Sequence, residues 1–522
     1  MAVSEAAAPS SGEHFLRNVL WGWTGVVFSL LSGILLSPYI IHHLGDERYG
    51  IWALGFSVID YYNLVDFGFR SAVLKYVAHY RVTGELDRIE EIVSTALTYF
   101  SIAAILLLCA TAVMATYFIG FFRITPQNIG DFRFVIVTVG IGVSFGAVMN
   151  SFGATLEAHQ RFDISSRIDI VNSALRISGC FLALYFGFGI KALALSILTG
   201  QMTGYFLTYR AVGRVLPNAV FSVHKVTRRA LRQLAGYGAH TFMANTSFMV
   251  MSQDGPLLIG HFLSASWVAY FAYPWRLLFY SSDLVGRLGM VTGAKTAELM
   301  AYDDISGIAR MTLIVNRYCL MLFLPLAFYL SIFGRQLLYV WINPNFALNS
   351  EPVIPWLATG VVIAISAGHN STSVLYGMAK QQILARAAFT EACCNVAGLW
   401  FIVPRYGIVG AAAWIATLMI ISRGIYVPWE VARNVRITFR QYLAGIYGRP
   451  LSIGLPVAAL TWFVNRAIGQ PVTWSAVILG GGAMTAVYFG AVYLWGLEPQ
   501  HRRMMVNMAL RSVNPLTRWK AA

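Results

Sequence analysis

The feature that most constrains the fold is a series of apolar stretches, each about 20 residues long and so able to span a bilayer as a helix. Charged residues form only 12% of the 522 residues, whereas soluble domains average about 25%. Helices satisfy their own backbone groups in lipid, so the sequence predicts a polytopic all-α membrane protein. Fourteen spans are predicted, at 18–41, 50–72, 92–119, 132–156, 168–187, 190–209, 236–261, 267–290, 312–334, 352–376, 384–403, 407–428, 450–468 and 472–495.

The N-terminal segment and the cysteines offer no candidate functional site. The N-terminal segment has no basic n-region and no Ala-x-Ala site, so we expect no cleaved signal peptide and a retained first span. All five cysteines fall within apolar stretches and lack metal-ligand spacing. Free cysteine packs as a small apolar residue, so we expect core positions and no metal site.

The net charge of +15 follows the predicted topology. Of the 38 Lys and Arg residues, 25 lie on the side of the membrane that carries the N-terminus and seven on the other side. Lys and Arg accumulate in cytoplasmic loops, so both termini are expected in the cytoplasm. The excess of Lys and Arg residues would attract anionic membrane lipids. No nucleic-acid partner is expected. The basic loop at 211–232 either enforces this orientation or grips lipid headgroups.

An internal repeat relates two halves of the chain at an offset of 217–218 residues. The offset pairs Pro38 with Pro256, Asp66 with Asp283, and Gly189 with Gly407. A six-span unit keeps its topology when it is copied, so the repeats are parallel and related by an axis along the membrane normal. The predicted parts are an N-terminal six-helix bundle (15–210), the basic loop (211–232), a C-terminal six-helix bundle (233–430), two additional spans (450–495) and a basic cytoplasmic tail (496–522).

Charged side chains at membrane depth are the candidates for function, because placing them in lipid is costly. A D-x-x-x-R pattern occurs in both halves, and residues four apart lie on one face of a helix, where each charge partly neutralises the other. We expect both pairs to face one central cavity. The candidate substrate-binding residues are Arg70, Arg276, Arg287, Arg317 and Arg176, and the candidate charge partners or ion-coupling residues are Asp60, Asp66, Asp254 and Asp283.

These charges leave two interpretations open. The functional one is a cationic cavity for an anionic substrate, because arginine binds phosphate oxygens in a bidentate fashion. The structural one is buried ion pairs between helices, or arginines that reach toward the interface. No phosphate-binding loop and no H-E-x-x-H motif occurs, so we expect no ATP hydrolysis, no cofactor and no enzyme activity.

Three motifs in the first hundred residues carry a family resemblance. They are Asn18-x-x-Trp21-x-Trp23, then Pro38 followed by His43-Leu44-Gly45-x-x-x-Tyr49-Gly50-Ile51-Trp52, and Leu64-x-Asp66-x-Gly68-x-Arg70-Ser71-Ala72. The chain resembles the bacterial polysaccharide (O-antigen type) flippases of the multidrug/oligosaccharidyl-lipid/polysaccharide exporter superfamily. The resemblance implies two six-helix bundles that form a V around a cationic cavity.

The resemblance also implies a function in the bacterial inner membrane. It implies transfer of undecaprenyl-pyrophosphate-linked oligosaccharide from the cytoplasmic to the periplasmic leaflet by alternating access. Expected partners are the lipid-linked oligosaccharide, a polysaccharide polymerase and a chain-length regulator, and the chain is expected to be a monomer. Two alternatives stay open: a cation- or proton-coupled multidrug antiporter, and a polytopic membrane glycosyltransferase or polymerase.

Overall fold

The computed structural model describes residues 36–503, apart from some side chains between 237 and 294 and between 366 and 369. This part of the chain consists of helices and turns and has no strand, which confirms the all-α class. Helices coincide with every predicted span except the first, most of which lies outside the described residues. By length and hydropathy alone, eight helical segments of the described part can cross a membrane. One of them, Gln381–Asn434, contains two predicted spans.

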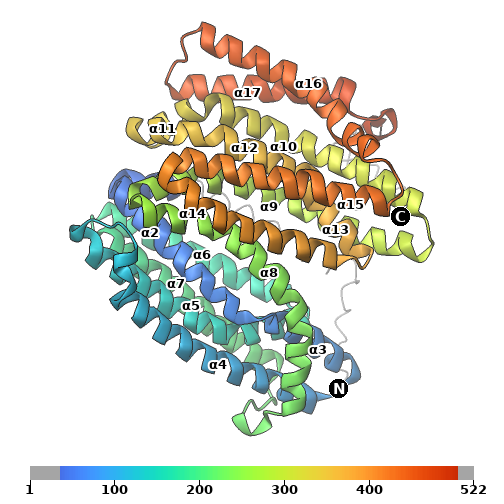
Figure 1. Cartoon of the computed structure of the whole chain (residues 1–522). Coiled ribbons are helices and arrows are strands. Elements are labelled where there is room, and N and C mark those ends of the chain that lie inside the picture. Colours follow the sequence, from blue (N-terminus) through green and yellow to red (C-terminus); the bar gives the residue numbers. More distant parts are fainter. Residues whose placement is uncertain (1–35, 504–522) are drawn as a thin grey trace, which may run out of the picture. The chain divides into compact units, whose positions relative to one another are not determined.

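The chain divides into two compact units, which are described separately. Unit 1 comprises Met1–Tyr273 and Ala388–Ala411, and unit 2 comprises Pro274–Ala387 and Ala412–Ala522. After a helical stretch at 36–44, the helices of unit 1 are α2 (Asp46–Asp60), η1 (Tyr61–Asp66), α3 (Phe69–Thr83), α4 (Leu86–Thr116), η2 (Phe118–Phe121), η3 (Pro126–Asn128), α5 (Ile129–Ala158), α6 (Phe162–Tyr185), α7 (Gly189–Val215), η4 (Val223–Lys225) and α8 (Arg228–Phe262) (Figure 1). Helices α9 (Ala265–Ala301) and α14 (Gln381–Met419) contribute to both units.

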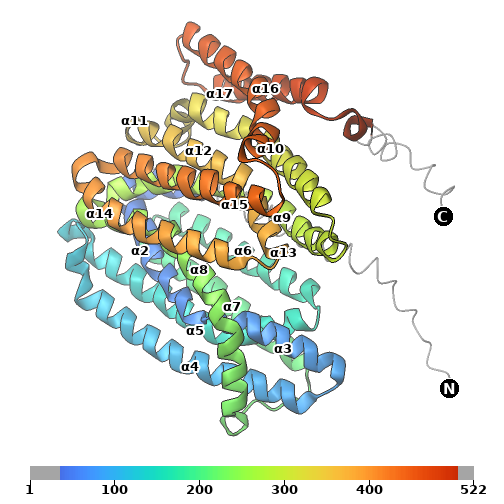
Figure 2. The same ribbon diagram turned by 45° about the vertical axis from the view of Figure 1, so that its right-hand side comes forward.

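Helix α5 is central to the packing of unit 1. It lies between α4 and α7, and α7 packs in turn against α6 (Figure 1 and Figure 2). A separate apolar cluster joins α3, α4 and the start of α8 through fully buried residues such as Val73, Val93, Phe100 and Leu234. Burying one such side chain contributes about 1.5–3 kcal/mol, so this cluster fixes α3 against α4.

Unit 2 is built around α10. Its helices are α10 (Ile305–Trp341), α11 (Pro344–Ser350), η5 (Glu351–Val353), α12 (Ile354–Ile363), η6 (Ala364–His369), α13 (Asn370–Gly377), η7 (Ile420–Tyr426), α15 (Val427–Asn434), α16 (Phe439–Ala467), α17 (Trp474–Ala491) and η8 (Val492–Gly496). The two additional spans predicted at 450–468 and 472–495 are α16 and α17. Both pack on α10, so they belong to this unit's core.

A buried polar network fixes α16 on α10. The Asn316 amide donates to Ser371 Oγ at 3.1 Å and to Tyr442 Oη at 2.9 Å, and all three residues are buried. Farther along the same two helices, the Gln336 amide donates to Asn465 Oδ1 at 2.9 Å. Buried amides that lose a partner are costly, so these bonds set the register of α16 against α10.

Two repeat-related turns each contain a glycine with positive φ. Gly189 has φ 72° at the start of α7, and Gly407 has φ 60° at a kink inside α14. Both values lie in the left-handed region, where glycine has no Cβ to clash. The offset of 218 residues thus pairs two glycines with positive φ at turns between spans, while the assignment of 15–210 and 233–430 to two bundles stays a prediction.

Candidate functional site

The second predicted span is broken in its middle. Helix α2 ends at Asp60, the 3-10 turn η1 follows, and α3 begins only at Phe69. Between them, Phe67 and Gly68 are left-handed, with φ 48° and 73°. A bulky residue in this conformation costs about 1–3 kcal/mol of backbone strain, and such strain clusters at ligand sites. The repeat-related helix α9 carries no such break over Ala265–Ala301.

The break changes how Asp66 and Arg70 interact. The Asp66 carboxylate accepts a hydrogen bond from the Arg70 backbone N–H at 3.1 Å, while the Arg70 guanidinium donates to Glu157 Oε1 at 2.5 Å. The prediction that the two residues share one continuous helical face is therefore wrong, although their charges still attract each other. Sequence analysis missed Glu157 because it follows the fourth span and has no local signal.

Two adjoining cavities lie beside this break, both within unit 1. Their volumes are about 380 and 320 Å³, within the usual range of small-molecule sites. Both are lined by Asn63, Asp66, Arg70 and Asn150. The larger cavity is also lined by Phe56, Ile59, Asp60, Tyr62, Val139, Val143, Gly146, Ala147, Met149, Gly153, Gln201, Tyr205 and Thr208, and the smaller by Leu64, Phe67, Gly68, Phe242 and Met249.

Small residues on α5 bring polar side chains of α7 to the larger cavity. A Cβ at Gly142 would lie 2.2 Å from Gln201 Oε1, and one at Gly146 would lie 2.3 Å from Tyr205 Oη. The Tyr205 hydroxyl also donates to Gly142 O at 3.2 Å. Glycines at helix contacts permit this close approach, so the α5 glycines position an amide and a phenol on the cavity wall.

The described lining mixes polar and apolar side chains and carries both signs of charge. Among the described residues lining the two cavities, Asp60 and Asp66 are acidic and Arg70 is basic. The side chains of Asp283 and Arg287 lie outside the described residues. The cationic character expected from the sequence therefore stays a prediction.

The predicted aspartates of unit 1 have amide partners. Asp60 Oδ2 accepts from the Gln253 amide at 2.8 Å. Asp254 is 3% exposed, and both of its carboxylate oxygens accept from Asn395 Nδ2, at 3.0 and 2.9 Å. Glu391, also buried, precedes Asn395 by one helical turn on α14. Asn395 and Glu391 had no sequence signal, because they are distant in the chain from Asp254.

Of the other predicted arginines, Arg176, Arg276 and Arg317 line neither cavity. Arg176 lies on α6 in unit 1 and is half-buried. In unit 2, Arg276 is exposed on α9, and Arg317 donates to Gly445 O at 2.7 Å and to Glu498 at 3.2 Å. The Arg317 contacts join α10 to α16 and to the segment after α17, an arrangement typical of a structural ion pair.

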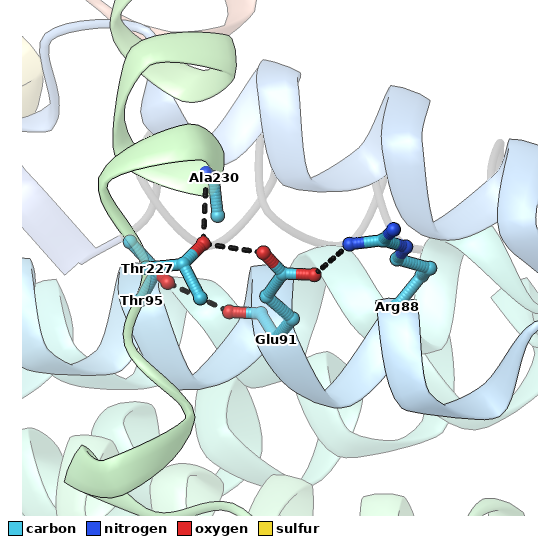
Figure 3. Close-up of polar contacts among 5 residues, drawn as sticks. All are labelled: Arg88, Glu91, Thr95, Thr227 and Ala230. Atoms are coloured by element: carbon cyan, nitrogen blue, oxygen red, sulfur yellow. Dashed lines mark hydrogen bonds and ion pairs between the residues drawn. The ribbon is translucent and has the colours of Figure 1, made fainter.

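The basic loop between α7 and α8 is fastened to the start of α4. Glu90, which is 4% exposed, accepts from Lys225 Nζ and from the Val220 backbone N–H. Next to it, the Thr227 hydroxyl donates to Glu91, and Glu91 also accepts from Arg88 at 2.6 Å (Figure 3). Thr227 Oγ1 in turn caps α8 by accepting from the Ala230 backbone N–H at 3.1 Å. The loop therefore has structural contacts beyond its expected effect on orientation.

The comparisons identify the family. Residues 15–292, more than half of the chain, match the family model described as "Polysaccharide biosynthesis protein". The chain belongs to this family. This result confirms the resemblance to polysaccharide flippases that the N-terminal motifs indicated.

Individual relatives of this polysaccharide biosynthesis family member are distant but match over most of their length. "Putative O-antigen transporter" of Shigella flexneri is 19% identical over 80% of this chain and 98% of its own. "Probable flippase AglR" of Haloferax volcanii is 22% identical over 88% and 92%. Among solved structures, "Lipid II flippase MurJ, inward closed conformation" superposes with a TM-score of 0.70 at 13% identity, over 92% of this chain and 99% of that one. The last likeness shows a shared fold.

Proposed function

We propose that this protein moves undecaprenyl-pyrophosphate-linked oligosaccharide repeat units across the bacterial cytoplasmic membrane by alternating access. One observation carries the proposal: a family match to polysaccharide biosynthesis proteins coincides with a cavity, lined in part by polar and charged side chains, inside a unit of membrane-spanning helices. An O-antigen transporter and a flippase among the relatives support the same substrate class. The chain carries out transport and no covalent chemistry.

The physical task of such a protein is to shelter a polar headgroup. Each polar group that enters hydrocarbon without a hydrogen-bond partner costs several kcal/mol, so an oligosaccharide does not cross lipid unaided. Amides, hydroxyls and carboxylates on the cavity wall replace the water that the headgroup loses. The polyprenyl tail stays in the bilayer, where it loses no solvation.

We assign roles to the charged residues on this basis. The pyrophosphate meets Arg276 and Arg287 of the second repeat, because arginine forks match phosphate oxygens. Arg70 contacts the substrate through the guanidinium N–H groups that Glu157 leaves available. Asp254, with Asn395, is the coupling site for a proton or a cation, since a buried carboxylate changes affinity for substrate when its charge changes.

The proposal includes topology and partners. Both termini lie in the cytoplasm, as the distribution of Lys and Arg favours. The two six-helix halves alternate access as separate bundles, and the transporter acts as a monomer that delivers repeat units to a polymerase and its chain-length regulator.

A deletion strain tests the proposal. We expect lipid-linked repeat units to accumulate on the inner face of the membrane and to clear when the wild-type gene returns. Gly153→Leu should fail to complement, because Gly153 lines the larger cavity and a Cβ there meets no atom within 4 Å, so the new side chain fills the cavity. Gly213→Leu is the matched control: Gly213 also has open space, lines neither cavity and should complement.

The outcomes separate the alternatives. An unchanged pool of lipid-linked units in the deletion strain would overturn the proposal, and lowered drug resistance in that strain would favour the multidrug antiporter. If Gly153→Leu complements the deletion, the transport path does not run through the larger cavity of unit 1.

A further inference from the structure

The smaller cavity of unit 1 has an aromatic wall. The Phe67 ring stacks on the Phe242 ring, with centroids 4.0 Å apart and planes 5° from parallel. Phe67 nevertheless stays 45% exposed. Its second face is therefore available to a ligand in the cavity that it lines.

The backbone holds this ring in place at a cost. Phe67 has φ 48°, a conformation that bulky side chains rarely adopt. Every other described non-glycine residue with positive φ lies in a turn that joins two helices: Gln160, Asp303, Ala379, Arg436 and Gln470. Among the described non-glycine residues, Phe67 alone adopts this conformation inside a predicted span, beside a cavity. Strain maintained at such a place indicates a ligand contact.

Polar groups surround the ring on the same wall. Asn63 and Asn150 supply amide donors and acceptors, Asp66 supplies a carboxylate, and Arg70 supplies N–H donors. A hexopyranose ring has an apolar C–H face and a rim of hydroxyls that both donate and accept. The cavity therefore matches a sugar ring in both respects.

The charges of this wall oppose an anion. The Arg70 guanidinium is already engaged by Glu157 at 2.5 Å. Asp66 adds a carboxylate on the same wall, and Asp60 adds one in the adjoining cavity. Asp169 of α6 interacts electrostatically with Glu157 and Arg70. A phosphate or uronate here would meet more negative than positive charge among the described groups.

We propose that the cavity at Phe67 binds one neutral or amino-substituted sugar ring, stacked on the free face of Phe67, and excludes acidic sugars and the pyrophosphate. This inference rests on the proposed function, which it deepens by dividing the headgroup between two places. The charged pyrophosphate end binds outside this cavity, and the sugar bound here sets which glycan is accepted.

Binding of free trisaccharides to the purified full-length protein tests the proposal. Saturation-transfer NMR titrations would compare chitotriose, its de-acetylated amino form and trigalacturonate. We expect both of the first two to bind at least about tenfold more tightly than trigalacturonate, and Phe67→Ala to weaken their binding about tenfold. Asn150→Leu should weaken it also, which covers the case in which Phe67→Ala does not fold. Phe67→Tyr should retain binding.

Phe186→Ala is the matched control, since Phe186 is 63% exposed and lies at the turn between α6 and α7, away from both cavity linings. Equal binding of trigalacturonate, displacement of chitotriose by inorganic pyrophosphate, or unchanged affinity in both Phe67→Ala and Asn150→Leu would overturn the proposal. These results are independent of the deletion strain. Accumulated lipid-linked units together with any of them would leave the flippase function standing and refute the sugar site alone.

Discussion

Gly50 offers the sharpest test of the packing in unit 1. A Cβ added at this α2 glycine would lie 1.7 Å from the backbone oxygen of Ala265, whereas ordinary contact begins at 3.4 Å. In Gly50→Ala the two segments must therefore separate by about 1.7 Å. Because both atoms that meet are close to rigid backbone, no side-chain rotation relieves the overlap.

The cost follows from what this separation breaks. The Tyr270 hydroxyl donates to Asp46 at 2.9 Å across the same contact, and a shift of this size ends that bond. Overpacking costs about 1–3 kcal/mol and a hydrogen bond to a charged group about 1.5–3 kcal/mol, so we expect a loss of about 3–5 kcal/mol. The shift in melting temperature is the lost free energy divided by the unfolding entropy, which is about 0.6 kcal/mol/K for the roughly 300 residues of unit 1, so the apparent melting temperature should fall by about 5–8 °C.

The assay is the fraction of full-length, fluorescently tagged protein that stays monodisperse in detergent after heating. Gly213→Ala is the control: it lies on α7 with no atom within 4 Å of its Cβ, and replacing a helical glycine by alanine stabilises by about 0.5–1 kcal/mol. It should melt at or slightly above the wild-type temperature. A Gly50→Ala protein that melts within about 2 °C of wild type would refute the reasoning.

Three further predictions use the same protein. Arg70→Gln and Glu157→Gln should each lower the free energy of unfolding by about 2 kcal/mol, a value between those for exposed and buried ion pairs, because the two side chains are 44% and 23% exposed. The double variant should lose less stability than the sum of the two single variants, and additive losses would contradict the pairing. Glu90→Gln should speed tryptic cleavage after Lys225, since the ion pair that holds Lys225 of the loop to Glu90 on α4 is lost; an unchanged rate would argue against this ion pair holding the loop. Hydrogen bonds from the Gly307 N–H and Ser306 hold the pKa of Asp304 below its usual range, so its stabilising effect is present at neutral pH and lost as the pH falls through that lowered pKa. Asp304→Ala should then lower the melting temperature at pH 7, and by a smaller amount as the pH falls toward about 3; an equal effect at both values would contradict this.

The sequence by itself determined the class and most of the helices. Span length and hydropathy are local properties, and the bilayer converts them into helices, so the predicted spans within the described residues are helical apart from the break at Phe67 and Gly68 in the second. The family could also be read from short motifs, which the match over 15–292 confirms. Gly50 belongs to one of those motifs, and its close approach to Ala265 explains why glycine is required there.

Only the tertiary structure decided how the charges pair. The i, i+4 rule holds on a continuous helix, but the left-handed Phe67 and Gly68 end one helix and start another between Asp66 and Arg70. Arg70 then meets Glu157, which lies 87 residues away in the chain. Asp254 likewise meets Asn395, 141 residues away. Contacts between helices depend on how their faces pack, and hydropathy along one span contains no information about which partner lies across it.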